Sequence, residues 1–171
     1  MHGPSPPRGT PVFEDAYRNF SGYVARIGQR VLGRRDDVKD LVHDVFIAAR
    51  HALSKLDSEA AMRAYLGVVT VRLARRHLRR ERILSWVGMD SETDVEQLAS
   101  LDARPEDRLL LGTVYDVLKT LPTNQRIAWT LRYIEGSQLE EVASMCGCSL
   151  ATAKRRISAA HAAVSRSLAD E

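Results

Sequence analysis

The chain has few cysteines and no long apolar run, and each shortage excludes a class of protein. Of its 171 residues only two are cysteine, too few for a disulfide-stapled secreted scaffold and consistent with a reducing compartment. The longest uncharged apolar stretch, residues 65–71, is far shorter than the roughly 18 residues that a membrane span needs. The first eleven residues have no apolar segment of the kind that a secretory signal contains. These shortages predict a water-soluble cytoplasmic protein without membrane insertion.

Lysine is also scarce, with four residues against 21 arginines, and the charges are unevenly distributed. Residues 63–82 contain seven arginines and one acid, a local charge of +6. Residues 83–107 contain seven acids and one arginine, a local charge of −6, although the whole chain carries only +3. Basic clusters attract polyanions such as nucleic acids, whereas an acidic segment solvates a linker or repels nucleic acid. The two blocks therefore predict two separate tasks.

Apolar residues recur every three or four positions through most of the chain, which predicts helices, and no segment is typical of a strand. Three helices are expected before residue 83 and four after residue 105, whereas periodicity fades in the acidic segment between them. Four of the six prolines lie within the first eleven residues, which predicts a disordered arm. The expected organisation is an arm at 1–11, a first domain at 12–83, an acidic linker at 84–104 and a second domain at 105–171.

The sharpest local pattern lies in residues 137–168. Ser137 and Glu140 have the S-x-x-E spacing of a capping box, which predicts the start of a short helix. Gly147 permits the left-handed conformation that ends this helix, and Ser149 is placed to cap a longer one. A short helix, a three-residue turn containing glycine and a longer basic helix form a helix-turn-helix pattern, whose second helix enters the DNA major groove. The predicted fold is therefore all-α, with two small helical domains on a flexible linker and a helix-turn-helix in the second.

Two parts of the chain carry motifs of one protein family. Residues 121–164, LPTNQRIAWTLRYIEGSQLEEVASMCGCSLATAKRRISAAHAAV, resemble the promoter-recognition domain, region 4, of bacterial sigma factors. The segment DDVKDLVHDVFIAARHAL resembles the core of region 2 of the same family, and MRAYLGVVTVRLARRHLRRER resembles its DNA-melting helix. Because two independent motifs occur in the family's order, the chain resembles the extracytoplasmic-function type of sigma factor.

This resemblance implies a non-enzymatic function. The protein would be an alternative sigma factor that binds core RNA polymerase and directs it to promoter DNA through the −35 and −10 elements. An anti-sigma factor is an expected further partner, and no cofactor is expected. A free-standing helix-turn-helix regulator with a helical sensor or dimerisation domain is the competing hypothesis. The DLVHDVF helix and the basic third helix favour the sigma factor, because a sensor domain needs neither.

The resemblance and the exposed positions of the expected helices together predict three sets of site residues. The −35 element would be contacted by the first turns of the recognition helix, at Ser149, Thr152, Lys154, Arg155, Arg156 and Ser158. The −10 element would be contacted by the basic end of the third helix, at Arg72, Arg75, Arg76, Arg79 and Arg80. Core polymerase would be bound by the second helix, at Asp40, Leu41, Asp44, Val45 and Phe46.

For the apolar polymerase-binding candidates and for Arg156, the sequence also allows a structural role. The apolar members of the polymerase set could simply be core residues, which makes Asp40 and Asp44 the stronger candidates. Arg156 lies beside the packed face of its helix, so it is assigned either to a DNA phosphate or to an acid of its own domain, Glu140 or Glu141.

The remaining aromatic and sulfur-containing side chains have mainly structural interpretations. Tyr65 is expected to pack in the core, and Trp86 either stacks on DNA or polymerase or anchors the linker. Cys146 is expected to be a small core residue, and its spacing from Cys148 is not that of a zinc pair. The histidines add no metal-ligand spacing and no nucleophile–base pair, so neither a metal site nor an enzyme active site is expected.

Overall fold

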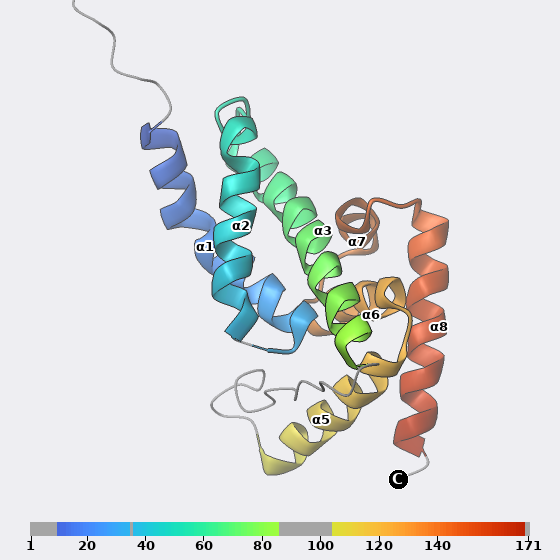
Figure 1. The fold of residues 1–171 in the computed structure, drawn as a ribbon. Helices are drawn as coiled ribbons and strands as arrows, with labels where there is room; N and C mark the ends of the chain where they lie inside the picture. The colour runs from blue at the N-terminus through green and yellow to red at the C-terminus, as the bar shows by residue number, and fades with distance from the viewer. Residues whose placement is uncertain (1–9, 35, 86–103, 170–171) are drawn as a thin grey trace, which may run out of the picture.

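The computed structural model describes residues 10–34, 36–85 and 104–169, and all regular structure in these residues is helical (Figure 1). None of these helices is both long and apolar enough to span a membrane. The all-α expectation is confirmed. The elements are α1 (Thr10–Leu32), α2 (Asp36–Leu53), α3 (Glu59–Ser85), α5 (Pro105–Thr120), α6 (Thr123–Trp129), a π-helical turn η1 (Thr130–Ile134), α7 (Leu139–Cys146) and α8 (Leu150–Ala169).

The first three helices form one bundle, which we call the first half. α1 and α3 each pack along α2 and against one another, and the apolar stripe of every helix points inward. Ser58 begins α3 as expected of a cap, since its hydroxyl accepts the backbone N–H of Ala61 at 3.1 Å. α1 begins at Thr10, two residues before the expected start of the first domain at residue 12. α3 ends at Ser85, two residues after the expected end of that domain at residue 83. The rest of the expected linker, including Trp86, lies outside the described residues.

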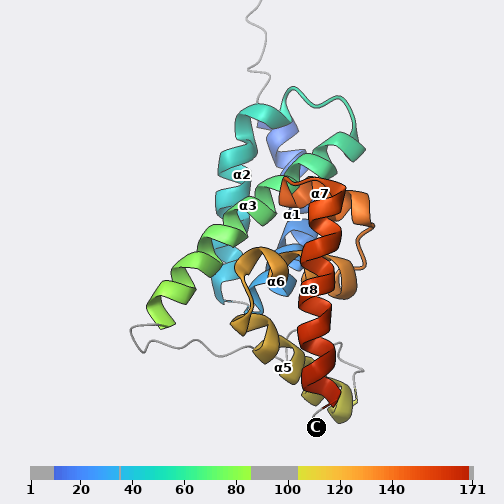
Figure 2. The ribbon, with the colours of Figure 1, turned by 90° about the vertical axis from the view of Figure 1, so that its right-hand side faces the viewer.

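The remaining helices form the second half, in which α8 runs along α6 with α7 near one end and α5 near the other (Figure 2). Pro105 is the first residue of α5, and the backbone N–H of Arg104 donates to the Asp107 carboxylate at 3.3 Å. The predicted helix after Pro122 changes to a π-turn at Thr130, where the N–H of Glu135 reaches back five residues to the Thr130 carbonyl at 2.9 Å. This wide turn is not visible in the apolar periodicity.

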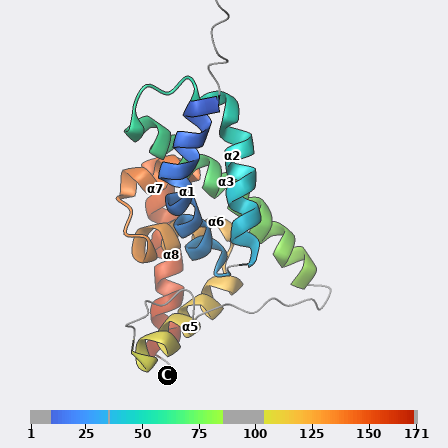
Figure 3. The same ribbon diagram turned by 90° about the vertical axis from the view of Figure 1, so that its left-hand side faces the viewer.

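The two halves pack directly against each other. Viewed from the α1 side, α1 has α2 on one flank and the second half on the other (Figure 3). The main hydrophobic cluster is continuous across both halves, because residues of α6, η1, α7 and α8 join those of α1–α3. Gly67 on α3 lies close to α7: a Cβ there would lie 3.0 Å from Cε of Met145 on α7, and 2.8 Å from the Tyr23 hydroxyl of α1. A glycine at this position lets α7 approach α3 closely.

Candidate nucleic-acid interface

α7, the following turn and α8 form the predicted helix-turn-helix. Gly147 has φ 62° and ends α7 in the left-handed conformation, as expected. Ser149 caps α8, because its hydroxyl accepts the Thr152 backbone N–H at 3.2 Å. The two helices pack against each other. Their buried side chains are Val142, Ala143 and Cys146 on α7 and Ala153, Ile157, Ala160 and Val164 on α8.

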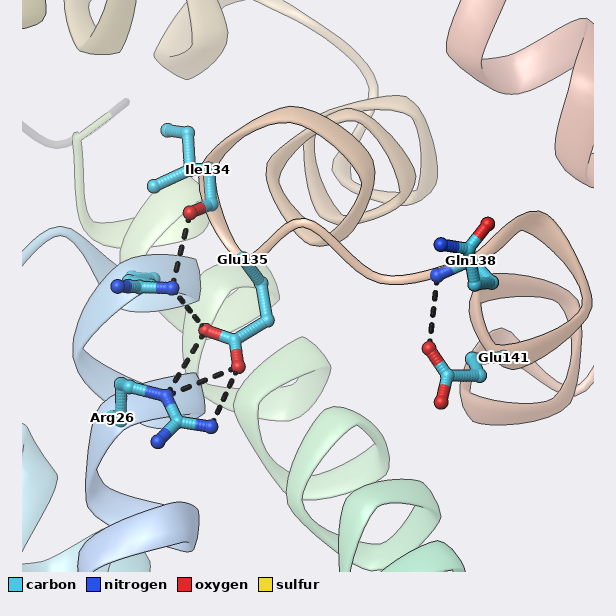
Figure 4. A network of polar contacts seen from close by, with 6 residues as sticks. Arg26, Ile134, Glu135, Gln138 and Glu141 are labelled. Atoms are coloured by element: carbon cyan, nitrogen blue, oxygen red, sulfur yellow. Dashed lines mark hydrogen bonds and ion pairs between the residues drawn. The ribbon is translucent and has the colours of Figure 1, made fainter.

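The predicted capping box at Ser137 and Glu140 is wrong by one residue. α7 begins at Leu139, and the backbone N–H of Gln138 donates to the Glu141 carboxylate at 2.8 Å (Figure 4). Ser137 is instead buried in the preceding loop, where its N–H donates to the Leu131 carbonyl at 2.9 Å.

Most of the predicted −35 residues lie on the solvent side of the helix-turn-helix. Ser149, Lys154, Arg155 and Ser158 are exposed, whereas Thr152 and Arg156 are half-buried. The Thr152 hydroxyl accepts a hydrogen bond from the Ser149 hydroxyl at 3.0 Å.

Arg156 forms no ion pair with Glu140 or Glu141 within the described chain, so that alternative is wrong. A phosphate contact stays the prediction for this residue.

Of the arginines at the basic end of α3, some are exposed to solvent and one contacts the second half. Arg72, Arg76, Arg79 and Arg80 are exposed and present a cationic surface. Arg75 is half-buried, and its Nη2 donates to the Cys146 carbonyl at 2.9 Å. Four of the five residues predicted to face the −10 element are therefore accessible here, and the fifth already has a protein partner.

The predicted polymerase-binding residues on α2 fall into an exposed group and a buried group. Asp40 and Asp44 are exposed. Leu41, Val45 and Phe46 are at most 1% exposed and belong to the main hydrophobic cluster, as their alternative interpretation states. A docking partner can reach the two acids directly, whereas the three apolar residues hold α2 in place.

Polar side chains that the motif analysis did not single out join the two halves. The Arg26 guanidinium donates to the Glu135 carboxylate, at 3.1 Å from Nε and 2.9 Å from Nη2 (Figure 4). Nη1 of Arg30 donates to the same carboxylate and to the Ile134 carbonyl, the latter at 3.0 Å. The Glu135 side chain is only 8% exposed, whereas the Arg26 and Arg30 side chains are 44% and 33% exposed, so the carboxylate is shielded from water and the guanidinium groups are not. The only sequence signal was that Glu135 lies within residues 121–164, the segment that resembles sigma region 4.

The C-terminal end of α1 receives two more donors from the second half. Nη2 of Arg126 donates to the carbonyls of Val31 and Leu32 at 3.2 and 2.9 Å. The Tyr115 hydroxyl donates to the Arg30 carbonyl at 2.5 Å. Burial lowers the pKa of Arg126 and raises that of Tyr115, because the charged form of each loses hydration. A guanidinium is well suited to the last carbonyls of a helix, which carry its negative dipole end.

Tyr65 and Cys146 pack as the sequence predicts, and both contact the main cluster. Burial raises the pKa of the Cys146 thiol to about 11, and the nearby Arg75 guanidinium offsets part of this shift. The residues that the structure describes contain no group of three or more histidines, cysteines or acids placed to hold a metal ion.

The fold and the helix-turn-helix define a helical DNA-binding protein with two packed halves, and family comparisons name its class. Residues 16–83 match the family described as sigma-70 region 2, and residues 111–164 match sigma-70 region 4. These two matches coincide with the first half and with most of the second.

Whole-chain comparisons agree with these matches. The chain is 28% identical over 167 residues to the RNA polymerase sigma-H factor of Pseudomonas aeruginosa, covering 88% of this chain and 86% of that one. It is 29% identical over 154 residues to the ECF RNA polymerase sigma-E factor of Haemophilus influenzae, covering 81% of each.

Two solved structures have a similar fold. The sigma factor RpoE in complex with the anti-sigma factor NepR from Bartonella quintana has a TM-score of 0.64 at 20% identity, covering 91% of this chain and 96% of that one. CnrH in complex with the cytosolic domain of CnrY has a TM-score of 0.61 at 26% identity, covering 93% of this chain and 88% of that one.

The chain belongs to the bacterial RNA polymerase sigma factors, and within them to the extracytoplasmic-function type. It is an alternative sigma factor that directs transcription initiation, as its sequence motifs predict. The competing hypothesis of a free-standing regulator is not favoured, because the first half matches sigma region 2.

Proposed function

We propose that this sigma factor reads the −35 element with the exposed face of α8. Lys154 and Arg155 lie in the first two turns of the helix and are exposed, which suits them to base edges in a major groove. Arg156 is half-buried at the margin of this face and is better placed for a phosphate. Ser149, Thr152 and Ser158 flank these residues.

The exposed arginines at the end of α3 are assigned to the −10 element. Arg72, Arg76, Arg79 and Arg80 supply the cations that strand separation needs near the phosphates. Arg75 can join them only when it leaves the Cys146 carbonyl. Melting the duplex this way requires binding energy and no bond-making chemistry, so the proposed function is non-enzymatic.

The exposed acids of α2 are assigned to core polymerase. Asp40 and Asp44 are four residues apart on one helix face, and the buried Leu41, Val45 and Phe46 keep that face rigid. An acidic face on a rigid helix suits a partner surface that presents arginines.

An anti-sigma factor is the further proposed partner, with the cytoplasm as the site of action. The support is the similarity to CnrH and RpoE, both of which were solved with a partner, the cytosolic domain of CnrY and the anti-sigma factor NepR respectively.

The observation that carries the proposal is that the acids Asp40 and Asp44 of α2 are exposed, as are the basic side chains at the end of α3 and in the first turns of α8. The test is an Asp40→Arg/Asp44→Arg variant in a core-polymerase binding assay, for which we expect a loss of at least tenfold in affinity with unchanged helical content. The matched control reverses two exposed acids on other segments of the first half, Glu14→Arg/Asp57→Arg, and should bind normally. Normal binding by the folded Asp40/Asp44 variant contradicts the docking assignment.

A second measurement distinguishes this function from that of a free-standing regulator. A sigma factor should bind its promoter duplex tightly only with core polymerase, whereas tight, sequence-selective binding by the purified chain alone would favour the regulator.

A further inference from the structure

The two cysteines of the chain lie one residue apart in the turn of the helix-turn-helix, and none of the roles assigned so far uses them. Cys146 is the last residue of α7, and Cys148 directly precedes Ser149, the cap of α8. Both thiols are free in the structure. Two thiols so near in the chain can join as an intramolecular disulfide where the backbone between them lets their Cβ atoms approach.

The backbone of this turn brings the two side chains to one apolar environment. The Cys148 N–H donates to the Ala143 carbonyl at 3.0 Å, which folds the chain back over the end of α7. Cys146 is a buried member of the main hydrophobic cluster, and Cys148 packs against the same cluster. The residue between them, Gly147, has φ 62° and no side chain to obstruct a rotation of the turn.

The two thiols differ in access and in acidity. Cys148 is half-buried, whereas Cys146 is 4% exposed. Burial raises the pKa of the Cys146 thiol to about 11, and the neighbouring Cys148 adds to this rise. Arg75, whose Nη2 donates to the Cys146 carbonyl, offsets part of the shift because its charge stabilises the thiolate. Cys148 is therefore the thiol that a reagent reaches first, and Cys146 is the second thiol, beside a cation.

We propose that Cys146 and Cys148 are a redox-sensitive pair, which a low-molecular-weight disulfide oxidises to an intramolecular disulfide that weakens binding to the −35 element. The effect on DNA rests on the proposed function, because it needs α8 to be the helix that reads this element.

The reaction is two successive thiol–disulfide exchanges. The Cys148 thiolate attacks the small disulfide, forms a mixed disulfide and releases one small thiolate, which takes up the proton that Cys148 lost. The Cys146 thiolate then attacks the Cys148 sulfur, closes the internal bond and releases the second small thiolate, which takes up the Cys146 proton. The pair loses two electrons and two protons, and the small disulfide gains both and becomes two thiols.

Closing the internal bond changes the turn, because a disulfide holds its two Cβ atoms about 3.8 Å apart and at a defined dihedral angle. The hydrogen bonds from Cys148 to Ala143 and from Arg75 to Cys146 hold the turn in its thiol form. Ser149 follows directly, and its hydroxyl caps the first turn of α8. A rotation of the turn therefore displaces this cap and the exposed basic side chains of the first turns of α8.

The experiment compares wild type with two single-thiol controls, Cys146→Ala and Cys148→Ala. Each chain is incubated with oxidised glutathione, freed of the reagent by gel filtration and only then added to untreated core polymerase, so that cysteines of the polymerase stay reduced. One readout is the mass of the intact chain, because an internal bond removes two hydrogen atoms, whereas a mixed disulfide adds a glutathione moiety. The other is the affinity of the assembled holoenzyme for promoter duplex, before and after treatment with dithiothreitol.

We expect oxidised wild type to lose two hydrogen atoms and about fivefold in promoter affinity, the scale of losing one helix cap, and dithiothreitol to restore both. Both controls should keep the affinity of reduced wild type after the same treatment, because neither can form the internal bond. An equal loss of affinity in Cys146→Ala with glutathione attached would assign the effect to the mixed disulfide and overturn the proposal.

Two further outcomes would contradict the proposal. An internal bond that forms only in urea would show that the folded turn forbids it. An internal bond in the folded chain with unchanged promoter affinity would overturn its effect on α8. The mass readout needs neither polymerase nor DNA: if reduced wild type supports no promoter binding, the proposed function fails, while the mass still decides whether the pair closes.

Discussion

The two halves of this sigma factor build their cores differently. α1, α2 and α3 pack on one another in all three pairings and contribute most of the main hydrophobic cluster. The second half has a smaller cluster of its own, with the buried residues Val114, Tyr115, Leu118, Trp129, Ala160 and Val164. Its other buried apolar residues, Ile127, Leu131, Val142, Ala153 and Ile157 among them, belong to the cluster that it shares with the first half.

This difference bears on how the recognition helix is held. Ala153 and Ile157, in the N-terminal part of α8, belong to the shared cluster, whereas Ala160 and Val164 belong to the second half's own cluster. The first half buries most of its apolar residues among α1, α2 and α3. The second half instead buries part of its apolar surface in the cluster that it shares with the first half.

The largest expected effect tests this comparison with one matched substitution in each core. Leu53→Ala in the first half and Leu118→Ala in the second remove the same atoms from sites that are at most 1% exposed. Each should lower the free energy of unfolding by about 2–5 kcal/mol, since burial is lost and a cavity remains. Leu53→Ala should lie nearer the upper value, because the smaller cluster around Leu118 can collapse more easily. Urea denaturation measures both, and a larger cost for Leu118→Ala would contradict the comparison.

The next effect concerns the surface of the second half that is proposed to contact DNA. Arg155→Ala should lose about 1–3 kcal/mol of discrimination at one or two positions of the −35 element, because an exposed arginine can make a bidentate contact with guanine. Arg156→Ala should instead weaken binding to all sequences alike and reduce the salt dependence by about one phosphate contact. Binding of polymerase holoenzyme to a promoter library at several salt concentrations separates the two. Full base preference with a lower salt slope in Arg155→Ala would make Arg155 a phosphate contact.

The smallest effect compares one helix cap in each half. Ser58 and Ser149 accept backbone N–H groups at 3.1 and 3.2 Å, so each alanine substitution should cost about 1 kcal/mol of stability. Ser149→Ala should also weaken promoter binding, because it loosens the first turn of α8, whereas Ser58→Ala should leave −35 recognition unchanged. Thermal unfolding and promoter binding of the two variants provide the measurements. Equal promoter binding by both would show that the cap of α8 is not needed for recognition.

Several parts of the fold were predictable because they depend on neighbours in the chain. Apolar residues every three or four positions predicted each helix, and the left-handed turn at Gly147 and the cap at Ser149 followed from local conformational preference. The start of α7 was misplaced, because the S-x-x-E spacing carries no information about the π-turn upstream. Ser137 lies buried in the loop before α7, and Gln138 is the cap residue.

The site was predictable to a similar extent. The chemical type of a residue identified the exposed positions Lys154, Arg155, Asp40 and Asp44, since charged side chains are rarely buried. Chemical type could not separate Arg75 from its neighbours on α3, because its partner is a carbonyl 71 residues away. The same limit applied to Arg126, which bonds across 94 residues to the end of α1.

The sequence by itself determined the helices, their order, the helix-turn-helix and the separate basic and acidic blocks, because these follow from periodicity, capping and composition within short segments. Only the tertiary structure decided that the two halves close on each other, that Glu135 lies against Arg26 and Arg30, and that a single hydrophobic cluster spans both. The physical reason is that these contacts join residues about 100 positions apart. Their energy depends on burial and on relative orientation, which no local pattern in the sequence records.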